Sequence, residues 1–373
     1  MGAVASPLTI LQVCSARAWD GVAASCFDLA LGLARADEQC TVACSPDSEL
    51  RRRAVSAGLR ILPVVFRGEA DWVTAKTLRS FVTAHDVDVL HAHDSVALAV
   101  TALAGWGQPA AKVLTRSAHE PIASRLGRWA LRLGADHVLA TSLASRKALL
   151  ASGVPASELS VVLRGTAIPH DRGAASSAGS GARSSAGDGP VIGTMGSLTR
   201  GKGIEDLIEA VKLLLPAHPR LTLLVIGDGP ERDPLGAMIT RTGLGDSVRL
   251  SGFIDQGADA LPGLDVYCAP AVSRASLGSL GEALAAAVPV VACPVGAVTE
   301  LVHHERTGLL APSRDPQALA NAIARLLDAP HWARGLGNAG RRLIRERHAL
   351  PGMVSKTRQA YAQLLAAQGT ATS

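Results

Sequence analysis

The residues best suited to chemistry lie in one glycine-rich stretch, 193–203, with the sequence Gly-Thr-Met-Gly-Ser-Leu-Thr-Arg-Gly-Lys-Gly. An apolar run at 190–192 precedes it, and residues 204–211 follow with apolar side chains at the spacing of one helical face. Backbone N–H groups of such a strand-to-helix turn can approach an anion, and the helix N-terminus adds about half a positive charge. Arg200 and Lys202 add donors that suit phosphate oxygens. The stretch indicates a phosphate-bearing ligand, with an ordinary turn carrying solvated basic residues as the alternative.

Two familiar nucleotide-binding patterns do not fit this stretch. The Walker A pattern requires Ser or Thr directly after its lysine, where Gly203 stands. The G-x-G-x-x-G spacing is also missing, and neither half of the chain opens with it and a suitably placed acidic residue. The sequence therefore disfavours a nicotinamide-dependent dehydrogenase.

Composition favours a folded protein with an anionic partner. The chain has 373 residues, enough for two domains, of which 48% are hydrophobic and 18% charged. A net charge of +5 favours an anionic small molecule or an anionic membrane surface as partner. We expect no nucleic-acid partner, because no dense basic run is interleaved with aromatic residues.

Cysteine usage and hydropathy bear on the compartment. The six cysteines form no C-x-x-C pair and no metal-binding spacing, which favours reduced, buried thiols. We find no signal-peptide pattern and no run of about 18 apolar residues that could span a membrane. We therefore expect a cytoplasmic protein, peripheral at the inner face of the membrane if its acceptor is lipid-linked.

The elements that must position these residues alternate between strands and helices in both halves of the chain. This alternation predicts an α/β fold with two doubly wound, Rossmann-like domains, whose functional residues gather at the carboxyl ends of parallel strands. A Gly/Ser/Ala-rich tract separates the two halves and is typical of a flexible linker. The predicted divisions are a first domain at 1–169, a linker at 170–189, a second domain at 190–350, and a final helix with the tail at 351–373.

Polar residues end two predicted strands of the first domain. His91, His93 and Asp94 lie at the end of the predicted strand 87–92, and the spacing of the histidines would direct both side chains to one face. We expect no metal there, because no third ligand is in view; a hydrogen-bonding role and a plain strand-end polar cluster both remain open. Arg116 and His119, after the next strand, are comparable candidates for contact with an acceptor or a sugar.

Four stretches of the second half resemble the nucleotide-sugar-binding domain of the group 1 (family 4) glycosyltransferases, which have the two-domain GT-B fold. They are Gly196-Ser-Leu-Thr-Arg-Gly-Lys-Gly, Ile226-Gly-Asp-Gly-Pro-Glu, Val248-Arg-Leu-Ser-Gly-Phe, and the run from Glu282 through Gly296 and Glu300 to Thr307-Gly-Leu-Leu-Ala-Pro. The first half resembles the family more loosely. The resemblance implies two domains facing across a cleft, the first binding acceptor and the second binding donor. It also implies that the last helix, 353–366, crosses back to the first domain.

The resemblance also implies roles for individual residues. Lys202 would hold the donor diphosphate, Glu282 would accept hydrogen bonds from the ribose hydroxyls, and backbone N–H groups of the helix start would face the diphosphate. A solvated helix glutamate is the alternative for Glu282, and a tight turn without ligand contact is the alternative for Gly227 and Gly229. The implied donor-binding set is Gly21, Gly196, Ser197, Arg200, Lys202, Gly227, Gly229, Phe253, Ile254, Gly278, Ser279, Leu280 and Glu282. The implied acceptor or sugar contacts are Trp19, Asp20, His93, Asp94, Arg116 and His119.

One departure from the family pattern concerns charge. Arg274 stands where the family has the first of its paired glutamates, which helps to hold the transferred sugar. We predict that Arg274 binds donor phosphate or the carboxylate of an acidic sugar, and we group it with Lys202 and Glu282 as the catalytic candidates.

A basic stretch in the first half bears on membrane contact. Arg125, Arg128 and Arg132 recur at helical spacing beside Trp129. This pattern is compatible with a membrane-surface helix attracted to anionic lipid, or with the solvated face of a packed helix.

Together these observations predict a retaining glycosyltransferase that moves a sugar from a nucleotide-diphosphate sugar to a hydroxyl of a glycan or lipid-linked acceptor. The predicted setting is cell-surface polysaccharide or lipopolysaccharide biosynthesis, and the nucleotide sugar is a co-substrate with no metal or other cofactor expected. Two alternatives remain: a degenerate, non-catalytic partner subunit, because the first glutamate is replaced, and a nucleotide-sugar epimerase on the same fold.

Overall fold

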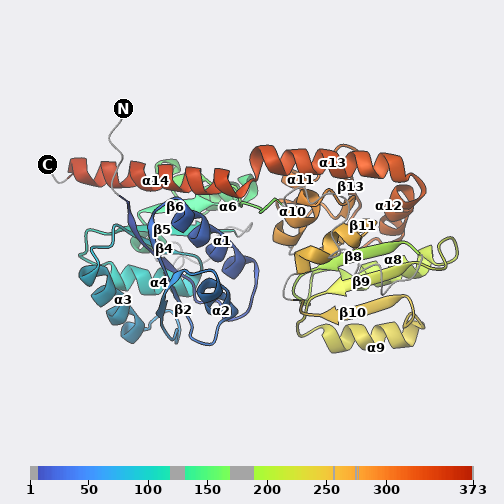
Figure 1. The fold of residues 1–373 in the computed structure, drawn as a ribbon, viewed down its shortest axis with the longest axis horizontal. Coiled ribbons are helices and arrows are strands. Elements are labelled where there is room, and N and C mark those ends of the chain that lie inside the picture. The colour runs from blue at the N-terminus through green and yellow to red at the C-terminus, as the bar shows by residue number, and fades with distance from the viewer. Residues whose placement is uncertain are drawn as a thin grey trace. The chain divides into compact units, whose positions relative to one another are not determined.

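The computed structural model describes residues 7–117, 131–168, 189–254, 257–273, 275 and 277–371. The chain forms two compact units: unit 1 comprises Met1–Gly165 with Leu350–Ser373, and unit 2 comprises Thr166–Ala349 (Figure 1). The boundary thus lies a few residues before the predicted one. The predicted linker, 170–189, lies outside the described residues except at its last position.

Unit 1 is built on a seven-stranded sheet in the order β3-β2-β1-β4-β5-β6-β7, in which every pairing is parallel. Its strands are β1 (Thr9–Val13), β2 (Gln39–Cys44), β3 (Arg60–Pro63), β4 (Val89–Ala92), β5 (Ala111–Arg116), β6 (His137–Ala140) and β7 (Leu159–Val161). Its helices include α1 (Gly21–Arg35), α2 (Glu49–Ser56), α3 (Trp72–Ala84), α4 (Ser95–Ala104), α6 (Leu143–Ala151) and the C-terminal α14 (Leu350–Ala371).

Two apolar clusters cover the two faces of this sheet. One joins the sheet to α3 and α4 through residues such as Leu78 and Val100, and the other joins it to α1 and α14 through Leu29 and Tyr361. Helix α14 therefore packs against α1 within unit 1, although 184 residues of unit 2 separate it from the rest of that unit in the sequence.

Unit 2 repeats the plan with a six-stranded parallel sheet in the order β10-β9-β8-β11-β12-β13. Its strands are β8 (Val191–Met195), β9 (Thr222–Ile226), β10 (Val248–Gly252), β11 (Val266–Ala269), β12 (Val290–Ala292) and β13 (Leu309–Leu310). Its helices are α8 (Ile204–Leu214), α9 (Arg232–Thr242), α10 (Leu277–Ala285), α11 (Val298–Leu301), α12 (Pro316–Asp328) and α13 (Pro330–Arg347).

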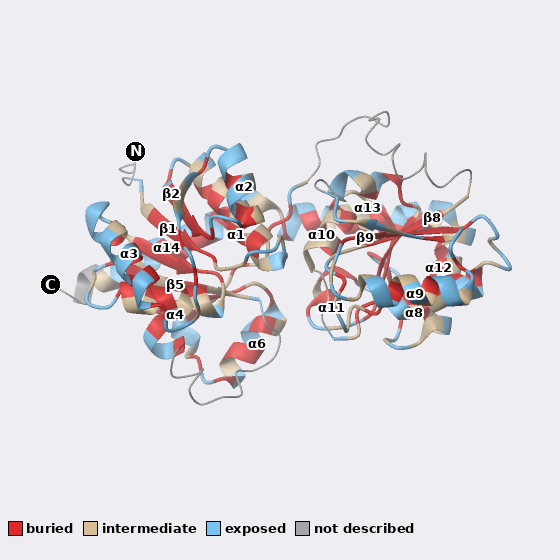
Figure 2. Ribbon diagram, turned by 90° about the horizontal axis from the view of Figure 1, so that it is seen from below, coloured by how far each residue is buried: buried red, intermediate tan, exposed pale blue. Residues whose placement is uncertain are grey.

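The prediction of two doubly wound α/β domains is confirmed. In each sheet the chain moves outward from a first strand and then returns to its other side, so the strand order reverses between β1 and β4 and between β8 and β11. Buried residues concentrate along the strands and on the helix faces that cover them (Figure 2). A crevice forms at such reversal points, outside the carboxyl ends of the strands, because the flanking helices leave on opposite faces.

Two further sequence predictions concern the state of the cysteines and membrane-spanning helices. All six cysteines are buried and unpaired, as their spacing predicted. Among the helices of the described ranges, none combines the length and apolarity needed to cross a bilayer.

Candidate active site

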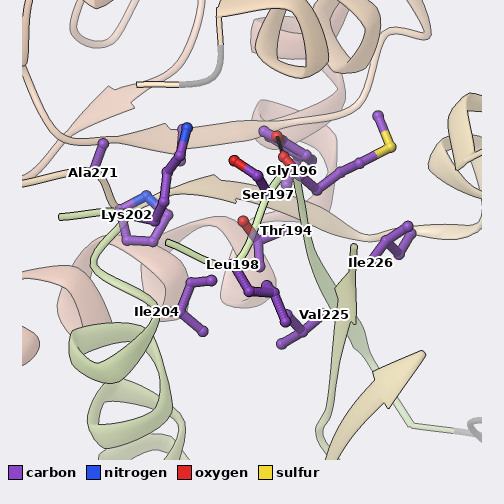
Figure 3. A pocket seen from close by; sticks show the side chains of 13 residues that line it. Thr194, Gly196, Ser197, Leu198, Lys202, Ile204, Val225, Ile226 and Ala271 are labelled. Carbon is purple, nitrogen blue, oxygen red and sulfur yellow. Dashed lines mark hydrogen bonds between the residues drawn. The ribbon is translucent and has the colours of Figure 1, made fainter. Parts of the chain in front are cut away.

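The pocket of unit 2 lies where its strand order reverses, and the predicted glycine-rich turn forms much of its wall. The turn leaves β8 at Gly196 and enters α8 at Ile204. Figure 3 shows the amino end of Lys202 and the hydroxyl of Ser197 on the same side of the pocket, away from Ile204 and Val225. The pocket thus joins a polar rim to an apolar base. Its lining residues are Thr194, Met195, Gly196, Ser197, Leu198, Lys202, Ile204, Val225, Ile226, Tyr267, Ala269, Pro270 and Ala271.

Gly203 fixes the direction in which α8 begins. Its φ of 70° lies in the left-handed region, and a Cβ there would stand 1.9 Å from the carbonyl oxygen of Pro270. Only glycine fits this approach of the turn to the end of β11. The same contact brings Lys202, the preceding residue, to the pocket.

Gly227 and Gly229 have a packing reason of their own. A Cβ at Gly227 would stand 1.9 Å from the carbonyl oxygen of Gly196, and one at Gly229 would stand 2.4 Å from that of Leu198. Neither glycine lines the pocket. The turn after β9 thus packs directly against the glycine-rich turn after β8. This packing agrees with the tight-turn alternative for both glycines.

Arg200 lies outside the pocket that Lys202 lines. Its side chain is 92% exposed, and its Nε lies 3.2 Å from Oε1 of Glu231. An exposed pair of this kind contributes little to stability.

The first turn of α10 carries three of the predicted donor-binding residues. Gly278 and Ser279 lie in this first turn, and Leu280 follows with a fully buried side chain. The Ser279 hydroxyl donates to the carbonyl oxygen of Met195 at 2.8 Å, and the Tyr267 hydroxyl donates to Ser279 at 2.9 Å. Glu282 is half-buried one turn further along the helix.

Three predicted site residues of unit 2 remain: Phe253, Ile254 and Arg274. Phe253 and Ile254 follow β10 directly and are 50% and 38% exposed, so their apolar surfaces are accessible to a ligand. Arg274 lies outside the described residues.

In unit 1, the loop before α1 is held by contacts of its own. Asp20 caps α1, because its carboxylate accepts hydrogen bonds from the N–H groups of residues 22 and 23 at 2.9 Å. The Arg53 guanidinium lies 4.1 Å above the Trp19 ring, and the carbonyl oxygen of Gly21 accepts from Arg164 at 2.7 Å. The structure therefore gives these three predicted residues local structural contacts.

Asp94 also has a structural task. Its carboxylate accepts from the backbone N–H and the hydroxyl of Ser15 and from the N–H of Ala97, which caps α4 and ties it to the end of β1. It lies at the point where the strand order of unit 1 reverses.

His91, in β4, and His93, just after it, belong to a buried hydrogen-bonded network. Their rings stack with centroids 4.5 Å apart, and His93 donates from Nε2 to the amide oxygen of Gln12 at 2.6 Å. His91 contacts the Tyr361 hydroxyl at 2.5 Å and Thr115 at 2.7 Å. Burial lowers the pKa of His93 to about 4, and burial with the neighbouring ring lowers that of His91 well below its ordinary value.

Arg116 is the remaining predicted contact that the structure describes. It ends β5, it is half-buried, and burial lowers the pKa of its guanidinium. Among the residues of the described ranges, none forms an ion pair with it. His119, Arg125 and Arg128 lie outside the described residues, whereas Arg132 is exposed and donates to the carbonyl oxygen of Gly153 at 3.2 Å.

Sequence reasoning missed three residues that organise the buried polar networks of the two units: Gln12 and Tyr361 in unit 1 and Tyr267 in unit 2. A signal existed for two of them, because Gln12 interrupts an apolar strand and Tyr267 lies in the apolar run 266–269. The partners of these residues come from distant parts of the chain, which the sequence pattern does not reveal.

Comparison with known proteins assigns both halves of the chain to one group of enzymes. The model described as Glycosyltransferase Family 4 matches residues 19–168, and the model described as Glycosyl transferases group 1 matches residues 189–329. Together the two matches cover most of the chain.

Individual relatives agree with this assignment. The chain is 33% identical over 218 residues to the 2-deoxystreptamine glucosyltransferase of Streptomyces kanamyceticus, a match that spans 56% of each protein and thus little more than half of that relative. It is 29% identical over 301 residues to the phosphatidyl-myo-inositol mannosyltransferase of Mycobacterium leprae, covering 76% of each.

A solved structure supports the fold. The complex of Anabaena HepE with UDP-glucose superposes with a TM-score of 0.84 at 23% identity, over 95% of this chain and 100% of that one. With two Rossmann-like units and a family match in each, the chain belongs to the group 1 (family 4) glycosyltransferases of GT-B fold.

Proposed function

We propose that the protein transfers a sugar from a nucleotide-diphosphate sugar to a hydroxyl of a glycan or lipid-linked acceptor, with retention of anomeric configuration. The relatives named above transfer glucosyl and mannosyl groups, and HepE binds UDP-glucose, which supports a nucleotide-sugar donor. The relative named for phosphatidyl-myo-inositol supports a lipid-linked acceptor, and with it a place in cell-surface glycan synthesis at the inner face of the membrane.

One observation carries the proposal: Lys202, in the turn that follows β8, lines the pocket at the point where the strand order reverses between β8 and β11. The first turn of α10 is tied to the end of β8 by the Ser279 hydroxyl. A diphosphate placed there would meet an ammonium group and the backbone N–H groups of two segments. An ammonium group together with backbone N–H groups can bind a doubly charged diphosphate, so no long basic run is needed.

The same groups explain how transfer would be accelerated. As the bond between the sugar and the diphosphate breaks, negative charge develops on the leaving diphosphate. Lys202 and the α10 amides, which are already in position, would stabilise that charge more in the transition state than in the ground state. Because the protein supplies the cation, we expect turnover to need no metal ion, and activity should survive EDTA.

Ligand binding tests the donor site directly. UDP, GDP and ADP and their sugars would be compared by thermal shift; one of them should stabilise the protein by about 2.7 kcal/mol at a hundredfold excess over Kd. Lys202→Ala should weaken that ligand at least about tenfold, since a charged hydrogen bond contributes about 1.5–3 kcal/mol. Lys212→Ala is the matched control, because Lys212 is exposed on α8 and does not line the pocket. Failure of all three nucleotides to bind, or equal affinity in Lys202→Ala, would contradict the proposal.

Product analysis tests the remaining parts. The anomeric proton coupling of the product, measured by NMR and compared with that of the donor, distinguishes retention from inversion. Transfer to a lipid extract but not to soluble sugars would support a lipid-linked acceptor.

A non-catalytic partner subunit is the second candidate, and Arg274 favours it because it replaces a carboxylate of the family pattern. This alternative predicts weak donor binding or none, and no release of nucleotide in the presence of any acceptor. If the chain is non-catalytic, Arg274→Glu should show no turnover, as in the wild type. If the chain is catalytic and Arg274 binds the donor, Arg274→Glu should bind the donor more weakly than the wild type.

A further inference from the structure

The buried hydroxyl of Tyr267 and the hydroxyl of Ser279 connect three segments of unit 2. Tyr267 lies on β11 and is 1% exposed, Ser279 lies in the first turn of α10, and Met195 is the last residue of β8. Tyr267 contacts Ser279 at 2.9 Å and the Met195 carbonyl oxygen at 3.3 Å, while Ser279 contacts that carbonyl at 2.8 Å.

Proton counting sets the direction of these bonds. The Met195 carbonyl can only accept, and each hydroxyl carries one proton. The two shorter distances therefore order the chain as Tyr267 to Ser279 to Met195. Burial raises the pKa of Tyr267, so its phenol keeps its proton and remains a donor throughout the working pH range.

This order has a consequence for how Ser279 acts. Its hydroxyl proton points to the Met195 carbonyl, so the side chain of Ser279 holds this carbonyl instead of donating to a ligand. Met195 directly precedes Gly196, where the turn that carries Lys202 begins. The hydrogen-bonded chain thus sets the position of the first turn of α10 against the turn after β8.

We propose that Tyr267 and Ser279 are positioning residues for the donor diphosphate: they lock together the two segments that bind its charge. The inference rests on the donor site proposed above, and it assigns a function to two hydroxyls that would not themselves contact the ligand. Loss of either hydroxyl would let the α10 amides shift relative to Lys202, and it would weaken contacts to the diphosphate without affecting contacts to the nucleoside.

The test compares each nucleoside diphosphate with its own nucleoside. UDP, GDP and ADP are measured by isothermal titration, and uridine, guanosine and adenosine by ligand-observed NMR. Tyr267→Phe should weaken the preferred diphosphate about threefold to tenfold, the equivalent of one buried hydrogen bond, and leave its nucleoside unchanged. Ser279→Ala should weaken the diphosphate at least as much, whereas Ser279→Thr, which keeps the hydroxyl, should restore affinity to within about twofold.

The matched control is Tyr361→Phe, the same change at the only other tyrosine, which is buried in unit 1. It should leave diphosphate affinity unchanged. Equal weakening of diphosphate and nucleoside would show a general loss of stability and overturn the inference, as would full diphosphate affinity in both Tyr267→Phe and Ser279→Ala. In either case binding of the diphosphate by the wild type would keep the proposed function intact. Should Tyr267→Phe not fold, the partly exposed Ser279 still decides the question.

Discussion

The buried histidine His93 should make unit 1 more sensitive to acid, and replacing it with glutamine should remove the part of that sensitivity that His93 causes. His93 is 5% exposed, and burial lowers its pKa from 6.5 to about 4. The unfolded chain therefore binds a proton as the pH falls through 6.5, while the folded chain stays neutral until about pH 4. Protonation favours the unfolded state, so the contribution of His93 to stability is complete above pH 6.5 and is lost as the pH falls to 4.

The expected size follows from these two pKa values. Between pH 7.5 and 5.0 the group costs about 2 kcal/mol, because the unfolded state is almost fully protonated at pH 5.0 and the folded state is not. His91, with a pKa lowered in the same direction, adds to the loss. Asp28 acts oppositely, since burial raises the pKa of its carboxyl to about 6. The comparison of His93→Gln with wild type therefore isolates His93, and the pH profile of the wild type alone does not.

Urea unfolding at the two pH values provides the assay. Tryptophan fluorescence follows unit 1, because four of the five tryptophans belong to it. They are Trp19, Trp72, Trp106 and Trp129, whereas Trp332 belongs to unit 2. The wild type should lose roughly 0.7–1 M more of its urea midpoint than His93→Gln on going from pH 7.5 to 5.0, for a slope of about 2–3 kcal/mol/M. An identical pH dependence in both proteins would show that His93 is not held neutral in the folded state.

Three further changes should have distinct outcomes. Gly203→Ala should lower Tm by the equivalent of at least about 2 kcal/mol and abolish nucleotide binding, because the new Cβ meets the Pro270 carbonyl at a left-handed position; an unchanged calorimetric Tm would contradict the packing. Tyr361→Phe should destabilise unit 1 by about 2–4 kcal/mol in urea, since it leaves Nδ1 of His91 and the amide nitrogen of Gln12 without the hydroxyl that they contact; a loss below about 0.5 kcal/mol would argue that the phenol is not buried in a network. Arg200→Gln should change neither Tm nor donor affinity measurably, because the side chain is 92% exposed; a large loss of affinity would place Arg200 at the diphosphate after all.

The sequence was sufficient for the architecture and for locating the turn that lines the pocket of unit 2. Apolar runs indicate buried strands, and helical periodicity indicates helices with one buried face. Because these elements alternate along the chain, the sequence predicted two doubly wound sheets without knowledge of tertiary contacts. The turn with Lys202 could be found in the same way, because a strand, glycines and a helix are consecutive in the chain and their geometry is local. The ends of elements were less well predicted: α14 runs from Leu350 to Ala371, well beyond 353–366.

Only the tertiary structure decided which polar side chains form hydrogen bonds within the protein itself. Asp94 was an acceptor candidate by its place at a strand end, but its carboxylate caps α4 and holds Ser15. His93 is bound to Gln12, and Gln12 to Tyr361, a residue 349 positions away. Such pairings depend on strand order and on the return of the last helix to the first unit, and sequence periodicity carries no information about either. The residue types and local turns could therefore be read from the chain, whereas the assignment of each side chain to ligand or to framework required the folded molecule.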